Sequence, residues 1–208
     1  MDAVAVLKER FALKEVTPER YRTMGSAMMR FHLEQYAVEG LGNLCVLRTK
    51  AMLGLMELLT VVVTPNTGKN VPFLLIDAMD MGKKHLCYVE YYDCTAEGAD
   101  KDLLLAASAP YADVPNYAEK PAWYMKERME GSLIKTGDKA RLEQMALDAL
   151  QAYAQQAAVA PVKAENLPGL KAFQRRMVQE GNPASDAMTR TLGKKGAETF
   201  FTTVAMPV

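Results

Sequence analysis

The sequence has few cysteines, and none of them is spaced like a metal ligand or a redox pair. Its three thiols, Cys45, Cys87 and Cys94, form no Cys-x-x-Cys pair, and their odd number fits a reducing compartment better than a disulfide framework. Neither sign of charge is in excess, because 25 basic side chains balance 25 acidic ones. This balance excludes a strongly basic nucleic-acid binder, although it leaves room for a local charged patch.

Long apolar runs and glycine-rich nucleotide loops are missing too. The longest apolar stretch covers residues 51–63 and is interrupted by Glu57, so it falls short of the about 20 residues that span a bilayer. The first residues lack the cationic start and apolar block of a secretory signal, and we expect a cytoplasmic protein. The motifs Gly-x-Gly-x-x-Gly, Walker A, Gly-x-Ser-x-Gly and His-Glu-x-x-His are all absent. These absences argue against the common dinucleotide, P-loop, serine-hydrolase and zinc-protease chemistries.

What the chain does contain is the composition of an ordinary globular domain. It has 208 residues, of which 50% are apolar and 24% charged, so it can bury a core and is not expected to be disordered. No internal repeat is visible, and we expect residues 1–208 to form a single domain. The 14 methionines are typical core fillers, and they would also suit an adaptable ligand pocket.

The hydrophobic pattern predicts helices at both ends of the chain and a sheet between them. Thr17-Pro18-Glu19 resembles a helix start, and apolar residues then recur at helical spacing until Gly40. His32 lies beside this stripe, either as a catalytic base or, more simply, as a polar residue at the edge of the core. The middle of the chain is rich in Val, Leu, Ile and Tyr and predicts strands at 43–50, 53–64, 71–80 and 84–92.

The short separators between these strands decide the topology of the sheet. The turns at 65–70 and 81–83 are too short for parallel crossovers, so the strands should pair as an antiparallel meander. After them, Asp138 should cap a long helix that Pro161 ends, and a second amphipathic helix follows. This order of elements predicts an α+β protein with helices flanking a central antiparallel sheet.

The most informative residue is an aspartate inside an apolar strand. Asp77 ends the run Val-Pro-Phe-Leu-Leu-Ile, and side chains of one parity share a strand face, so it lies with Phe73 and Leu75. Burial on that face would raise the pKa of the carboxyl and keep a proton on it near neutral pH. Such a group is a poised general acid if a cleft opens onto it. Otherwise it is an edge-strand charge that discourages aggregation, or the partner of a lysine.

The neighbouring strand supplies a partner for this carboxyl. If the hairpin is symmetric about the turn at 67–70, Thr60 stands opposite Asp77, and Met56 lies on the same face. A hydroxyl directly opposite an acid can orient it through a hydrogen bond. A slip of one residue would turn Thr60 to the other face, so the function of this pair depends on the register.

These two strands resemble the central hairpin of the ferredoxin-dependent bilin reductases. In that family a strand ending in proline is followed by a Leu-Pro-x-x-x-x-Asp strand, and the spacings of Pro65, Pro72 and Asp77 match that pattern. Residues 179–200 are loosely similar to the closing helices of the family. The resemblance implies an α/β/α sandwich, shared with the red chlorophyll catabolite reductases, and a linear tetrapyrrole held between the sheet and the C-terminal helices.

The resemblance also implies a chemistry. In these enzymes a reduced ferredoxin delivers electrons singly, no flavin or metal is tightly bound, and a strand aspartate, here Asp77, protonates the pigment. Phycocyanobilin-type members have a histidine where this chain has Thr60. Threonine cannot give up a proton at neutral pH, so His85 on the next strand is the candidate substitute.

Three functions remain open on these grounds. The first is a bilin reductase-like oxidoreductase with Asp77 as proton donor. The second is a non-catalytic tetrapyrrole- or heme-binding protein on the same fold. The third is a different small-molecule enzyme that shares only the α+β arrangement. Retention or loss of a bound pigment's absorbance under reducing conditions separates the first two.

The remaining site candidates follow from what a bilin would need. Its propionates require cations, and Arg175 and Arg176 are candidates because guanidinium groups suit carboxylates; a solvated helix face is the simpler interpretation of both. Phe73, Leu75 and Met56 would contact the pigment. We expect neither nucleic acid nor a membrane as partner. An acidic ferredoxin would dock on a basic rim, whose candidates are Lys83, Lys84, Lys194 and Lys195.

Overall fold

An antiparallel sheet organises the fold. The computed structural model describes residues 1–182 and 184–208. Its strands are β1 (Leu13–Glu15), β2 (Thr23–Gly25), β3 (Met29–Val38), β4 (Gly42–Ala51), β5 (Met56–Thr64), β6 (Phe73–Asp80), β7 (His85–Tyr92) and β8 (Leu133–Thr136). Its helices are α1 (Ala3–Lys8), α2 (Glu19–Arg22), α3 (Asp102–Ser108), α4 (Lys139–Val159), α5 (Leu167–Gln179) and α6 (Ser185–Phe200). Shorter helical turns are η1 (Met52–Gly54), η2 (Ala109–Tyr111), η3 (Trp123–Glu127), η4 (Ala164–Asn166) and η5 (Phe201–Ala205).

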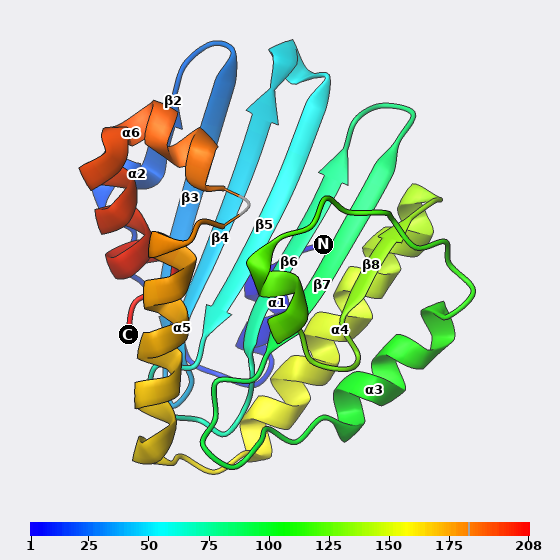
Figure 1. The fold of residues 1–208 in the computed structure, drawn as a ribbon, viewed down its shortest axis with the longest axis vertical. Helices are drawn as coiled ribbons and strands as arrows, with labels where there is room; N and C mark the ends of the chain where they lie inside the picture. Colours follow the sequence, from blue (N-terminus) through cyan, green and yellow to red (C-terminus); the bar gives the residue numbers. More distant parts are fainter. Residues whose placement is uncertain (183) are drawn as a thin grey trace.

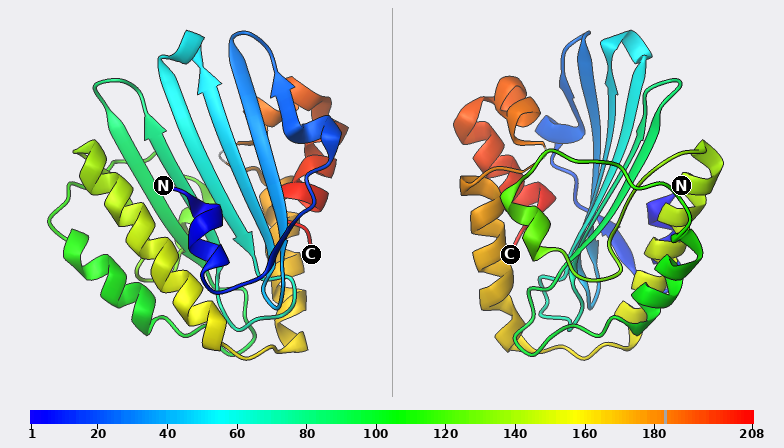
Figure 2. Two further views of the ribbon diagram at one scale, coloured as in Figure 1. Left: turned by 180° about the vertical axis from the view of Figure 1, so that it is seen from behind. Right: turned by 45° about the vertical axis from the view of Figure 1, so that its right-hand side comes forward.

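The elements form three layers. Within the described residues the strands make one 8-stranded sheet in the order β1-β3-β4-β5-β6-β7-β8, with β2 also paired to β3. Helices α5 and α6 lie on one face of the sheet, and α1, α3 and α4 lie on the other (Figures 1 and 2). The predicted α+β sandwich around an antiparallel meander is therefore confirmed. No helix in the described part of the chain is long and apolar enough to cross a membrane.

The register of the central hairpin agrees with the symmetric pairing predicted from the turn. β5 and β6 are antiparallel, and Thr60 is the direct partner of Asp77. β6 and β7 continue the pattern, with Tyr88 opposite Asp77 and Glu90 opposite Leu75. Because directly opposed residues point to the same face, these side chains all belong to the face covered by α5 and α6.

The long helix predicted for the first third of the chain is wrong. Helix α2 ends at Arg22, and residues 29–38 form β3, which pairs with β4 along its whole length and with β1 and β2 on its other edge. Phe31, Leu33 and Gln35 are buried and alternate with more exposed residues, and Val38 at the end of the strand is buried as well. Positions 21, 24, 28 and 31 fit a helical period, but pairing along both edges satisfies the backbone groups of the segment and overrides that local signal.

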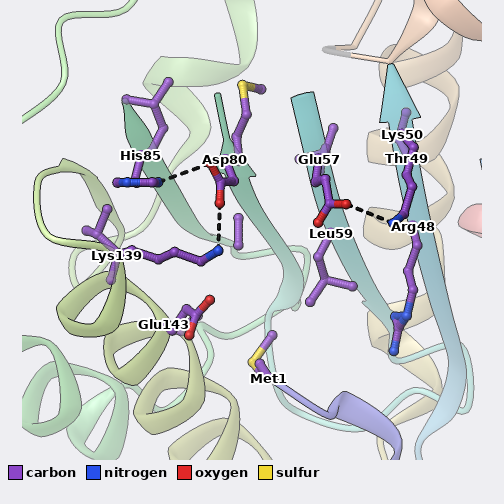
Figure 3. Close-up of a pocket in the computed structure, with 16 residues that line it drawn as sticks. Met1, Arg48, Thr49, Lys50, Glu57, Leu59, Asp80, His85, Lys139 and Glu143 are labelled. Carbon is purple, nitrogen blue, oxygen red and sulfur yellow. Dashed lines mark hydrogen bonds and ion pairs between the residues drawn. The ribbon is translucent and has the colours of Figure 1, made fainter. Parts of the chain in front are cut away.

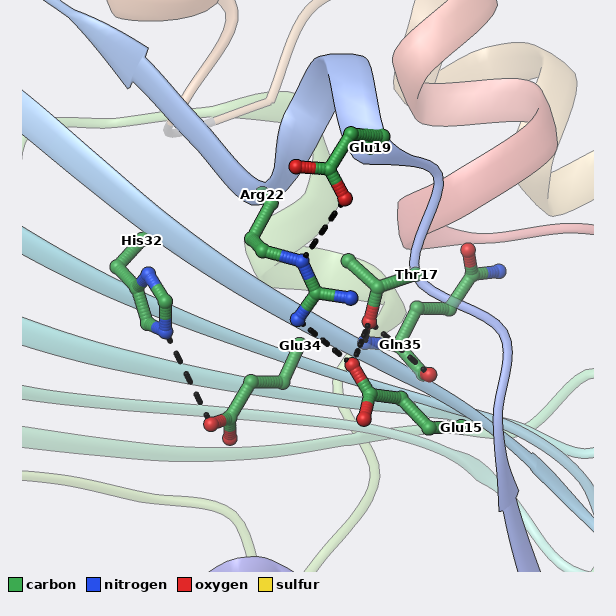
Figure 4. Close-up of polar contacts among 7 residues, drawn as sticks. All are labelled: Glu15, Thr17, Glu19, Arg22, His32, Glu34 and Gln35. Atoms are coloured by element: carbon green, nitrogen blue, oxygen red, sulfur yellow. Dashed lines mark hydrogen bonds and ion pairs between the residues drawn. The ribbon is translucent and has the colours of Figure 1, made fainter.

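The polar residues of this region accordingly have strand roles. Thr17 accepts a hydrogen bond from the backbone N–H of Gln35 at 2.9 Å and does not cap α2. His32 projects from β3 with a side chain that is 48% exposed, and its Nε2 lies 3.9 Å from a Glu34 carboxylate oxygen (Figure 4). His32 is therefore a surface residue of the sheet rather than a helix residue at the edge of the core.

Most of the sheet face under α4 is closely packed. Asp138 caps α4 by accepting a hydrogen bond from the Arg141 N–H at 2.9 Å, and the helix ends just before Pro161, as predicted. Tyr153 is fully buried beneath the helix and donates to the carbonyl oxygen of Pro72 at 2.8 Å. The strand residues that meet α4 include Val61, Val63, Leu74, Ile76 and Val89.

The opposite face is covered by less regular elements. Helix α5 buries Leu170, Phe173 and Met177, as the amphipathic pattern indicated. Helix α6 is broken at Gly193, whose φ of 72° lies in the left-handed region where glycine carries no steric penalty. The broken helix and the π turn η5 that follows it do not fill the layer as α4 does, and a cavity remains between them and the sheet.

Candidate functional site

A cavity of about 470 Å³ lies between the sheet and the C-terminal helices. Its volume is within the range of about 300–1,000 Å³ that small-molecule sites usually occupy. Strands β3 to β7 form one wall, and α5, α6 and η5 form the other. The segment from Tyr117 to Arg128 borders it as well. The lining is mostly apolar, with Phe31, Leu47, Met56, Leu58, Val62, Phe73, Leu75, Met177, Met188, Phe200 and Phe201 among its side chains.

Asp77 is the acidic group at the centre of the sheet wall. It is half-buried and lines the cavity. The Thr60 hydroxyl donates a hydrogen bond to its Oδ1. Burial raises the pKa of this carboxyl to about 6, and the bond from Thr60 opposes part of that rise. Asp77 therefore holds its proton well above the pH at which an exposed aspartate would lose it.

Asp77 should make the free energy of unfolding fall as the pH rises from about 4 to about 6. The unfolded carboxyl loses its proton above its ordinary pKa of 3.8, whereas the folded one keeps it up to about 6. The native state binds more protons over that interval, so stability declines there, by about 3 kcal/mol in total, and is constant above it. Glu90, whose pKa is raised to about 7, contributes a decline of the same sign. Asp77→Asn should therefore make the decline smaller by about 3 kcal/mol without abolishing it, which urea unfolding at about pH 4 and about pH 7.5 would measure.

Asp80→Asn is the matched control for this pH dependence. Asp80 lies three residues away on the opposite face, where a hydrogen bond from Lys139 lowers the pKa of its carboxyl. Its contribution therefore has the opposite sign, because stability is gained as the pH rises through its titration. If Asp77→Asn changed the free energy of unfolding equally at both pH values, the raised pKa of Asp77 would be contradicted.

A second buried acid lies on the same wall and was missed by the sequence analysis. Glu90 is 1% exposed, and its Oε1 accepts hydrogen bonds from Arg128 Nε at 2.5 Å and from the Tyr92 hydroxyl at 2.9 Å. The same guanidinium donates through both terminal nitrogens to Glu119, at 2.5 and 2.7 Å. Burial raises the pKa of Glu90 to about 7, against the opposing charge of Arg128. Two carboxyl groups whose pKa values are raised by burial thus border one cavity.

The cations at the cavity differ from those predicted. Among the described lining residues they are Arg128, whose side chain is 11% exposed, and the exposed Lys120. Arg176 instead bonds Glu127 at 3.1 Å and Glu180 at 2.7 Å, and it stacks on Trp123. Arg175 lies on the outer side of α5, away from the cavity. Spacing on α5 revealed that these two arginines share a polar side, but it could not show that the cavity lies beneath the other side.

His85 lies on the far face of the sheet from Asp77. It pairs with Asp80, and its Nδ1 is 3.4 Å from the Asp80 carboxylate, which also binds Lys139 at 2.6 Å. Figure 3 shows these three side chains together at a smaller cavity of about 280 Å³ beside α4. His85 does not line the cavity between the sheet and the C-terminal helices (the main cavity). Thr60, Phe73, Leu75 and Met56 all line the main cavity with Asp77.

The predicted basic rim is divided between two elements. Lys83 and Lys84 lie in the turn between β6 and β7, where the ammonium of Lys84 is 4.6 Å from the centre of the Tyr117 ring. Lys194 and Lys195 follow the Gly193 break in α6. No group of three His, Cys, Asp or Glu side chains in the described residues is arranged to hold a metal ion.

Comparison with known proteins identifies the fold of this chain. No protein-family model and no curated protein sequence matches this chain. Solved structures do match, and they show that the fold is that of a bilin reductase. One of these structures is the crystal structure of selenomethionine phytochromobilin synthase from tomato in complex with biliverdin. The TM-score is 0.68 and the identity 13%, and the alignment covers 96% of this chain and 79% of that one.

Proposed function

We propose that this protein binds a linear tetrapyrrole in the main cavity and reduces it through one-electron transfers, with Asp77 as proton donor. The observation that carries the proposal is a carboxyl with a raised pKa on the wall of a large apolar cavity. The tomato protein, which has the same fold, was crystallised with biliverdin. A flat conjugated pigment matches an apolar space between two layers, and its reduction requires an acid that is still protonated near neutral pH.

Each part of the cavity has a role in this mechanism. Thr60 fixes Oδ1 of Asp77, so the other carboxyl oxygen can deliver the proton. Phe73, Leu75 and Met56 would contact the pigment and exclude water, which keeps the acid protonated. Lys120 replaces Arg175 and Arg176 as the cation for a propionate, since ammonium groups pair with carboxylates. Arg128 is already shared between Glu90 and Glu119.

The electrons would come from outside the protein. We infer an external reduced ferredoxin and no tightly bound redox cofactor, as the family resemblance implies. Each ferredoxin carries one electron, so two encounters supply the pair that one double bond needs. The lysines at 83, 84, 194 and 195 remain the proposed docking rim for this acidic carrier.

A tetrapyrrole-binding protein without catalysis is the second candidate. The observation that favours it is Thr60, which occupies the position of a histidine in phycocyanobilin-type reductases and cannot give up a proton at neutral pH. Such a protein would hold the pigment in the same cavity and with the same lysine, Lys120. It would differ only in leaving the pigment unreduced.

A biliverdin titration followed by an anaerobic assay tests these functions in order. We expect the visible absorbance of biliverdin to shift on binding and to saturate at one pigment per chain. With reduced ferredoxin, the long-wavelength absorbance of the bound pigment should then be lost. Saturable binding without that loss would support the non-catalytic candidate, and an absence of binding would contradict both.

A further inference from the structure

We propose that Glu90 is a second proton donor of the main cavity and acts with Asp77 on the same bound pigment. This inference rests on the proposed function. Saturating one double bond consumes two electrons and two protons. Thr60 cannot supply a proton and His85 lies on the other face of the sheet, so the chain needs another acid at the cavity.

The register places the two acids close together on one wall. Asp77 on β6 is opposite Tyr88, and Glu90 on β7 is opposite Leu75, so the two acids are diagonal neighbours on adjacent strands. Diagonal neighbours on one face of an antiparallel pair lie about 7–8 Å apart. No hydrogen bond joins the two carboxyl groups, whose bonds from the described residues come from Thr60, Arg128 and Tyr92. Their separation would let each acid reach a different atom of one pigment.

Each carboxyl has one oxygen held by the protein and one that is not. The hydrogen bonds to Glu90 from the described residues, donated by Arg128 and Tyr92, all go to Oε1. The bond to Asp77 from the described residues, donated by Thr60, goes to Oδ1. Both residues line the cavity. We assign the second oxygen of each carboxyl, Glu90 Oε2 and Asp77 Oδ2, to the contact with a bound pigment.

The charges around Glu90 explain why it can hold a proton beside an arginine. Arg128 is shared between Glu90 and Glu119, so one positive charge faces two carboxylates. Asp77 adds a further negative charge when it is ionised, and this raises the pKa of Glu90. The cluster reaches neutrality when Glu90 carries a proton and Glu119 pairs with Arg128. Protonated Glu90 is therefore the state that burial favours.

The steps of the reduction balance with these two acids. The first ferredoxin is oxidised by one electron, the pigment becomes a radical anion, and the O–H bond of Asp77 breaks as a new bond to hydrogen forms on the pigment. The second ferredoxin gives up its electron, and the O–H bond of Glu90 breaks as the second bond to hydrogen forms on the pigment framework. The product is the dihydro pigment, and both carboxylates recover protons from solvent.

Anaerobic single-turnover reduction of bound biliverdin tests this assignment in Glu90→Gln. We expect the variant to bind the pigment and accept the first electron and proton. The neutral radical should then accumulate, visible by electron paramagnetic resonance, and decay at least about 100-fold more slowly than in the wild type, as expected when a general acid is lost. Gln retains an acceptor for Arg128 and Tyr92, and Glu57→Gln on the opposite face is the matched control, with no expected effect.

Infrared spectroscopy of the wild-type protein provides a test without a folding risk. Samples trapped after both proton transfers, before the carboxylates recover protons from solvent, should lose two carboxylic-acid bands, and Asp77→Asn should lack one of them. If Glu90→Gln reduced the pigment as fast as the wild type and accumulated no radical, the role of Glu90 would be overturned and the proposed function would remain intact. A wild type that does not bind or reduce biliverdin would instead overturn the proposed function, and this inference with it.

Discussion

Asp77→Asn should lower the rate of bilin reduction by at least about 100-fold and leave pigment binding nearly unchanged. General acids contribute about 10²–10⁴-fold to such rates, and the amide has the shape of the carboxyl without its transferable proton. The amide oxygen still accepts the hydrogen bond from Thr60, so the hairpin geometry should survive. Spectral titration with biliverdin measures binding, and a stopped-flow anaerobic assay with reduced ferredoxin measures the rate.

The control for this experiment lies on the same strand. Asp80→Asn removes an acid of equal size, but Asp80 faces α4 and bonds Lys139 and the Gly82 N–H. Its replacement should leave both binding and reduction unchanged. A fully active Asp77→Asn protein would show that the protons reach the pigment from another donor, and equal losses in both variants would point to damage of the fold.

Ile76→Ala should destabilise the protein by about 2–5 kcal/mol, and Leu75→Ala by clearly less. The two residues are adjacent on β6 and face opposite layers. Ile76 is 0% exposed and packs in the filled layer under α4, so truncation leaves a new void there. Leu75 is 7% exposed and borders a space that already exists, so its removal enlarges that space and forfeits less dispersion energy. Urea unfolding of both variants measures the difference.

The two variants should rank in the opposite order by their effect on biliverdin binding. Leu75→Ala removes a wall of the pigment site and should weaken biliverdin binding, whereas Ile76→Ala should change binding little at a temperature where it is folded. Equal losses of stability in the two variants would show that the layer between the sheet and α6 is as tightly filled as the layer under α4.

The sequence contained enough information for the central hairpin and its register. Short turns imposed antiparallel pairing, and a symmetric turn set Thr60 opposite Asp77, as the structure has it. The same argument extended over the next turn, at 81–84, would have placed His85 opposite Asp80 and Glu90 opposite Leu75. An acid between tyrosines on β7 was thus as clear a signal as the one on β6, and it was not followed.

Other features could not be predicted because they depend on contacts between distant segments. β3 is a strand because β4 pairs with it along its whole length, and its own apolar spacing is compatible with a helix. Arg128 follows an irregular, proline-rich stretch, and nothing in its local sequence indicates that its guanidinium reaches Glu90. The cavity itself is enclosed by β3 to β7 on one side and by α5, α6 and η5 on the other, segments far apart in the sequence whose packing no periodicity revealed.

The carboxyl at position 77 has a consequence for how such a protein evolves. Asparagine there would make the fold more robust in a neutral cell, so selection for robustness alone acts against the aspartate. A lineage that no longer needed Asp77 as a proton donor could replace it with asparagine, which makes the folded state more stable. Among related proteins, the residue at this position would then distinguish those that still catalyse the reaction from those that retain only the fold.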